Sequence, residues 1–107
     1  MTAYAIGHFL SVDVGPDIVA YLEKIDSTLE PYGGRFLVHG AKPSPLEGDF
    51  KGDLVVIAFP DMENARSWYD SPGYREILPL RLRNAVGEAF LIEGCDETHK
   101  ATDILAA

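Results

Sequence analysis

Two side chains able to do acid-base and anion chemistry stand on a stretch that otherwise has the composition of a buried strand. Arg35 and His39 flank Phe36, Leu37 and Val38, directly after a pair of glycines. An unperturbed imidazole titrates near pH ~6.5 and moves protons at neutral pH, and a guanidinium holds a carboxylate or enolate in a fork geometry. Strand alternation puts both on the face that carries Leu37. The alternative is a histidine hydrogen-bonded within the sheet and an arginine paired with an acid across a dimer.

The segment that follows this strand adds a carboxylate. Residues 42–52 hold two prolines, two glycines and several charges, which is typical of a loop. Glu47 lies within it, and a loop carboxylate beside a cleft can serve as a base or a ligand anchor. We assign His39 and Glu47 as candidate catalytic residues. A carboxylate that caps a turn or pairs with a lysine is the alternative for Glu47.

The second half of the chain supplies aromatic and cationic candidates. Trp68 and Tyr74 recur near helical spacing, which first of all indicates core packing, although Tyr74 follows the Ser71 cap and is placed to point its hydroxyl into a pocket. Arg81 is one of four arginines between residues 66 and 83, which form an anion-binding edge or, alternatively, pair with the surplus acids. Arg35, Trp68, Tyr74 and Arg81 are therefore the candidate ligand-binding residues.

Several classes of function lack sequence support. The formal charge of -8 disfavours nucleic acid and anionic membranes as partners, since both need a cationic footprint. A single cysteine, Cys95, and no zinc-protease spacing of histidines predict no metal site. The sequence contains no glycine-rich nucleotide motif, and we expect no cofactor. The N-terminus has no signal-peptide pattern and no apolar run approaches the ~20 residues of a membrane span, so we expect a cytoplasmic protein.

The elements that must position these residues alternate between strand and helix patterns. Strands are predicted over 3–12, 35–41, 54–59 and 85–93, the first from its period of two and the third from an uninterrupted apolar run. A helix is predicted from Pro16 to about Leu29, with Ile18, Tyr21, Leu22 and Ile25 on its apolar face. Asp61 and Ser71 each begin a further helix, and Pro79 should kink or end the last one.

This order of elements, βαββαβ, predicts an α+β fold of the ferredoxin-like type: an antiparallel sheet with its helices on one face. Residues 54–59 and 89–92 have no polar face, although helices can cover only one side of the sheet. A monomer rarely leaves a large apolar face uncovered. We therefore predict a homodimer in which two sheets pack face to face. The domain is expected over residues 1–94, followed by a tail at 95–107 that frays or docks on a neighbour.

A set of short motifs resembles a bacterial family. They are Gly33-Gly34-Arg35-Phe36-Leu37-Val38-His39-Gly40, Leu46-Glu47-Gly48, Phe59-Pro60, Ala65, Trp68, Ser71-Pro72 and Tyr74. Over residues 3–94 the chain is similar to the family labelled domain of unknown function 1330, within the dimeric α/β-barrel superfamily. The family usually has Arg where His39 stands and often Gly where Ala41 stands. The resemblance implies a ferredoxin-like dimer with a cleft, and no settled reaction.

Three hypotheses about function follow. The first is a dimeric protein that binds a small anionic or aromatic metabolite in a cleft. The second is a cofactor-independent enzyme of the isomerase or monooxygenase type, with His39 or Glu47 as the acid or base. The third is a structural or interaction module without a ligand, which a cleft filled by its own side chains would favour. Fold alone does not choose among them.

Overall fold

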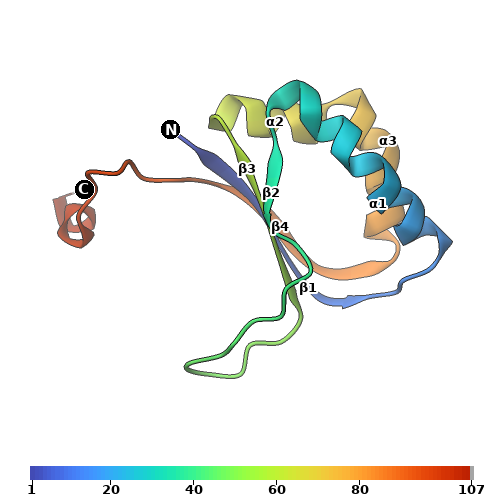
Figure 1. The fold of residues 1–107 in the computed structure, drawn as a ribbon, viewed down its shortest axis with the longest axis horizontal. Helices are drawn as coiled ribbons and strands as arrows, with labels where there is room; N and C mark the ends of the chain where they lie inside the picture. Colours follow the sequence, from blue (N-terminus) through green and yellow to red (C-terminus); the bar gives the residue numbers. More distant parts are fainter. Residues whose placement is uncertain (107) are drawn as a thin grey trace.

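The computed structural model describes residues 1–106; Ala107, the last residue of the predicted tail, lies outside the described residues. Four antiparallel strands form one sheet in the order β2-β3-β1-β4, and the helices pack on one side of it (Figure 1). The ferredoxin-like fold predicted from the sequence is confirmed. The elements are β1 Ala3–Val12, α1 Pro16–Leu29, η1 Glu30–Tyr32, β2 Arg35–Val38, β3 Asp53–Phe59, α2 Met62–Asp70, α3 Pro72–Leu82, β4 Ala85–Glu93 and η2 Ala101–Ala106.

Helix α1 begins and ends where its sequence requires. Pro16 occupies its first turn, where the missing N–H is not needed. Its buried side chains, Ile18, Tyr21, Ile25 and Leu29, form the stripe that faces the sheet. The chain then passes through η1 to Gly33, whose φ of 69° is the left-handed conformation that glycine adopts without strain. No helix among residues 1–106 is long and apolar enough to cross a membrane.

Helices α2 and α3 have side-chain caps. The Asp61 carboxylate accepts a hydrogen bond from the Asn64 amide at 2.8 Å, and the Ser71 hydroxyl accepts one from the Tyr74 amide at 3.2 Å. Of the two outcomes predicted for Pro79, a kink or an end of the last helix, the end is wrong, because α3 continues to Leu82. Pro79 lies on the exposed side of α3, where water can hydrate the carbonyl that its ring leaves unbonded, while Ile77 and Leu78 stay buried.

The strands alternate their side chains between two sheet faces. On the face toward the helices, Ala3 is opposite Phe59 and Ala5 is opposite Ile57. These residues join α1, α2 and α3 in the main hydrophobic core, where Trp68 is also buried. The helices thus cover one face completely enough to form a core.

The opposite sheet face, which we call the free face, carries no helix (Figure 1). Tyr4, Ile6 and their partners Ala58, Val56 and Ile92 alternate onto it. Phe90 and Ile92 remain 49% and 51% exposed, respectively. A soluble monomer seldom leaves so many apolar side chains contiguous and uncovered.

One strand differs from its prediction. β2 ends at Val38 instead of continuing to Ala41, and its pairing with β3 shifts register between Phe36 and Val38. Leu37 is the inserted residue, and an inserted residue reverses the alternation of everything after it. Residues 39–52 then form a long connection at one end of the sheet.

Candidate functional site

A cavity of about 550 Å³ lies between the sheet and the helices. Its floor is formed where the strands carry small residues on the helix-facing side: Ala5 and Gly7 of β1, and Ala85 and Ala89 of β4. Helix α1 forms the opposite wall through Ile18, Tyr21, Leu22 and Ile25. Because these residues have little side-chain volume, a space remains between the helices and the sheet that the core side chains do not fill. This volume lies in the range of pockets that hold small molecules, about 300–1,000 Å³.

Aromatic rings line much of this cavity. The rings of Trp68 and Tyr74 lie 4.1 Å apart between centroids, and Tyr69 lies 5.6 Å from Tyr74. The Trp68 indole N–H donates to the Thr28 hydroxyl at 3.0 Å, so its donor is already used. Trp68 and Phe36 therefore present ring surface to the cavity rather than filling it.

Two buried tyrosines provide the polar centre of the cavity wall. The hydroxyls of Tyr21 on α1 and Tyr74 on α3 are 2.7 Å apart and share one hydrogen bond. Burial, reinforced by the neighbouring Tyr74 hydroxyl, raises the pKa of Tyr21 far above its ordinary value. The Tyr21 phenol therefore remains neutral at physiological pH. One hydroxyl donates to the other, which leaves a single hydroxyl proton to be donated elsewhere.

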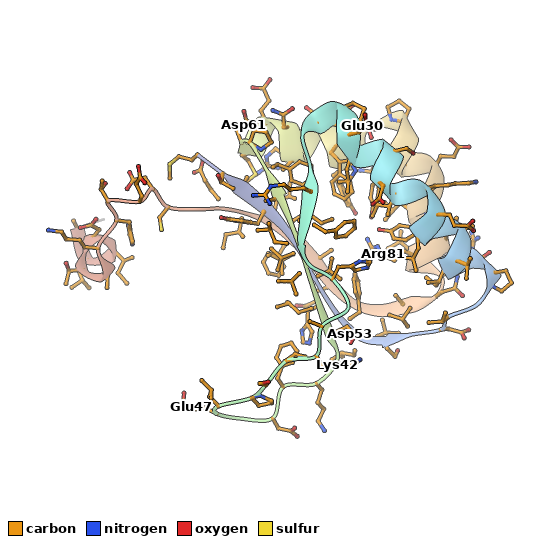
Figure 2. All side chains as sticks on the ribbon, viewed as in Figure 1. Glu30, Lys42, Glu47, Asp53, Asp61 and Arg81 are labelled. Atoms are coloured by element: carbon orange, nitrogen blue, oxygen red, sulfur yellow. The ribbon has the colours of Figure 1, made fainter. Side chains whose placement is uncertain are left out.

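Arg81 places a cation beside this tyrosine pair. Its side chain points from α3 into the space between the helices and the sheet (Figure 2), and its guanidinium carbon lies 5.1 Å from the centre of the Phe9 ring. Burial alone would lower the pKa of Arg81, but its interactions with Tyr74 and Tyr21 outweigh burial and raise it. Among residues 1–106, no carboxylate lies within ion-pair distance of Arg81. The cavity therefore holds a permanent positive charge that no carboxylate within residues 1–106 pairs with.

The cavity opens toward the base of the long loop. His39 is exposed there, and its ring stacks on Phe36 with 4.5 Å between the ring centroids. Lys42 and Asp53 also line this end, but they pair with each other at 2.8 Å (Figure 2). Their charges cancel, so Arg81 determines the sign of the charge inside the cavity.

The structure brings together four of the six residues predicted to form a site: His39, Trp68, Tyr74 and Arg81 all line the cavity. The prediction that Arg35 shares a strand face with His39 is wrong. Arg35 is opposite Ala58 and lies on the free face, because the register shift at Leu37 turns His39 to the side of Phe36. Glu47 lies at the tip of the loop, away from the cavity (Figure 2).

One residue of the site, Tyr21, was predicted only as part of the apolar face of α1. Its hydroxyl has a partner 53 residues away, so nothing in the local pattern indicates a polar role. A tyrosine in an otherwise aliphatic helix stripe is the only available signal. Within residues 1–106, no three histidine, cysteine or acidic side chains come together as a metal site would require.

A family model supplies the relationship of this chain to other proteins. The model described as a domain of unknown function (DUF1330) matches residues 2–95, nearly the whole chain. The chain belongs to this family. No curated protein matches the DUF1330 chain in sequence.

Solved structures of distant proteins share the fold of this DUF1330 chain. A protein of unknown function from Rhodopseudomonas palustris, RPA0582, is 23% identical, with a TM-score of 0.62 over 85% of this chain and 78% of its own. A dimeric ferredoxin-like protein of unknown function from Jannaschia sp. CCS1 is 10% identical, with a TM-score of 0.67 over 88% and 100% of the two chains. SnoaB from Streptomyces nogalater, a cofactor-independent oxygenase, is 17% identical, with a TM-score of 0.59 over 92% and 98%. At these identities the similarity extends to the fold alone.

Proposed function

We propose that this DUF1330 protein is a homodimer that binds a small, largely apolar organic anion in the cavity of each subunit. The observation that carries the proposal is Arg81: a cation without a carboxylate partner among residues 1–106, placed in a mainly apolar cavity of a strongly acidic chain. Arg81 is partly buried, and a charge that loses part of its hydration is stabilised by a counter-charge or by hydrogen bonds. A bound carboxylate or enolate would supply both.

The polar groups of the cavity are better suited to receive an anion than a cation. Arg81 is a donor only, and the hydrogen-bonded pair of Tyr21 and Tyr74 has one remaining hydroxyl proton. The acidic side chain at the opening, Asp53, is already paired with Lys42. The ligand is therefore expected to supply oxygen acceptors, and a carboxylate matches a guanidinium through two parallel hydrogen bonds.

The remaining walls favour a flat apolar body attached to the anionic group. Phe9, Phe36, Trp68 and Tyr69 present rings, and ring-to-ring contact is strongest in offset or tilted arrangements. The volume of about 550 Å³ suits one ring system with short substituents. An aromatic carboxylate is thus the ligand class with the best fit.

The free face supports the homodimer part of the proposal. Its contiguous apolar side chains, including Phe90 and Ile92, need cover, and a second identical face packed about 10 Å away would provide it with two-fold symmetry. The Jannaschia relative of this fold is described as dimeric. Each subunit would keep its own cavity, because the cavity lies on the other side of the sheet.

The test is a thermal-shift screen of aromatic carboxylates against their uncharged amides, followed by calorimetry on the best compound. Arg81→Met should weaken carboxylate binding about 100-fold, since charge-assisted hydrogen bonds contribute about 1.5–3 kcal/mol. The matched control is Arg83→Met, because Arg83 pairs with Asp17 at the surface. Equal binding by Arg81→Met and the parent protein, or equal binding of carboxylate and amide, would contradict the proposal.

A second candidate function is a cofactor-independent enzyme with His39 as the acid or base. The specific observation is that His39 stacks on Phe36 at the opening of the cavity, where its imidazole would face a ligand bound inside. Such an enzyme should show a limb in its pH–rate profile that disappears in His39→Gln. Glu47 enters this scheme only if the loop moves toward the cavity, and turnover unaffected by Glu47→Gln would exclude it.

A further inference from the structure

The chain beyond β4 leaves the body of the domain. The Gly94 amide donates to the Thr2 carbonyl at 2.7 Å, and every residue from 95 to 106 is exposed. We call residues 95–106 the C-terminal arm. Figure 1 shows it extending away from the sheet on the side opposite the helices, which is the side of the free face.

The arm has local structure of its own. The Asp96 carboxylate accepts hydrogen bonds from the Thr98 amide at 3.0 Å and from its hydroxyl at 2.7 Å, forming a tight turn. The Asp103 carboxylate accepts one from the Lys100 amide at 3.1 Å, at the start of η2. All of these bonds lie within the arm, so the turn and the start of η2 are each closed by groups of the arm itself.

The arm nevertheless exposes apolar side chains that packing against another surface would bury. Ile104 and Leu105 on η2 are 71% and 79% exposed. A helix as short as Ala101–Ala106 is marginal in water unless it packs on something. The radius of gyration is 15.3 Å, whereas a compact chain of this length has about 13 Å. The chain is thus more extended than a self-contained monomer.

The position of the arm indicates which surface receives it. It continues from β4, an edge strand whose Phe90 and Ile92 lie on the free face. If two free faces pack about 10 Å apart, the three residues before the turn, 94–96, span roughly 10 Å at 3.3 Å per residue, which is enough to bring the turn and η2 to the second copy. The helices of its own subunit lie in the other direction (Figure 1).

Charge favours the same arrangement. The arm carries Asp96 and Glu97 near its start. Arg35 lies on the free face of β2, the edge strand farthest from β4, and has no acidic partner within the described part of the chain. In a two-fold arrangement the arm of one subunit can approach the β2 edge of the other, where Arg35 would meet acidic residues.

We infer that the C-terminal arm of each subunit clasps the second copy of the chain, with Ile104 and Leu105 buried against it. This inference rests on the proposed homodimer. It names the surface that receives the arm, a second identical subunit, and explains why residues 95–106 are exposed although they form their own turn and helix. It also gives Arg35 a role at the interface instead of in the cavity.

The experiment uses the trypsin site at Lys100, which lies inside the arm. Cleavage after Lys100 is followed by mass spectrometry at protein concentrations above and below the dimer dissociation constant, which is measured by sedimentation. The clasp predicts cleavage about tenfold slower in the dimer than in the dilute monomer. Ile104→Asp combined with Leu105→Asp should abolish this protection and raise the dissociation constant about tenfold.

The control introduces two matching charges elsewhere. Val19→Asp with Leu82→Asp changes two exposed apolar residues on the helices, and should leave both protection and dissociation constant unchanged. A dimer whose arm is cleaved equally fast at every concentration would overturn the clasp alone. A chain that remains monomeric at every concentration would overturn the homodimer and the clasp together.

Discussion

The two faces of the sheet are built from the same strands and have opposite characters. On the helix-facing side, Ala5, Gly7 and Ala89 have small or no side chains. The cavity that contains Arg81 and two tyrosines lies between these residues and the helices. On the free face, Phe90 and Ile92 rise into open space. Alternation of side-chain size along a strand can therefore give each sheet face its own function. Small residues on one face leave room for a ligand, and large apolar residues on the other face form a surface for subunit association.

Removal of the Trp68 ring, on the face covered by the helices, should produce the largest effect, a loss of folding stability. Trp68 is 3% exposed and contacts Phe59, Tyr69 and Tyr74. Trp68→Ala is expected to lower the free energy of unfolding by about 3–5 kcal/mol, the usual result of truncating a buried tryptophan. Because this is the only tryptophan, urea denaturation should be followed by circular dichroism. A loss below about 1 kcal/mol would mean that the covered face is not the core.

A charge on the free face should act on association instead. Phe90→Asp is expected to raise the dimer dissociation constant about 100-fold or more, because an unpaired carboxylate would be buried between two sheets. Leu82→Asp, at an equally exposed position on α3, serves as the control in sedimentation equilibrium. If both variants dissociate alike, or neither does, the free face is not the interface.

The tyrosine pair predicts a pH dependence confined to the alkaline range. The folded state raises the pKa of Tyr21, so it binds this proton more tightly than the unfolded chain does. The resulting stability is fully present below pH ~10 and is lost as pH rises above it, with a slope of up to about 1.4 kcal/mol per pH unit. Tyr21→Phe should flatten this decline in denaturation experiments. An unchanged slope would argue against a buried neutral phenol.

The smallest effects should distinguish the two residues on either side of the register shift. His39→Gln is expected to weaken carboxylate binding about three- to tenfold, since it removes one polar contact at the opening. Arg35→Gln should leave binding within about twofold, because its side chain lies on the other face. Calorimetry with the same ligand checks both. A larger loss from Arg35→Gln would mean that the free face also contributes to ligand binding.

Much of the fold followed from the sequence, because local and global patterns agree. The apolar run at 54–59 gave β3, the Asp61 and Ser71 caps gave two helix starts, and the order of elements gave the sheet. The order of elements also correctly indicated that one sheet face would lack a helix. These features depend on composition and periodicity, which are visible without coordinates.

The site was only partly predictable, for two physical reasons. The inserted residue Leu37 turns His39 to the sheet face opposite that of Arg35, and no glycine or proline marks the position of the insertion. Tyr21 acquires its polar role only through Tyr74, which is remote in sequence. Strand alternation assumes an unbroken ladder, and a long-range hydrogen bond leaves no local trace. Both failures concern placement rather than residue type.

The small side chains beneath the cavity have an evolutionary consequence. Enlarging Ala89 would add apolar contacts inside the cavity, so a single substitution there should raise the stability of the subunit while removing room for a ligand. Gly7 is different, because a side chain there would overlap the Phe9 ring. Selection for stability alone would fill the cavity with larger side chains within a few mutations. A relative that keeps alanine at the position of Ala89 would therefore be one still under selection to accommodate a ligand, and a relative with a bulky residue there would have been released from that selection.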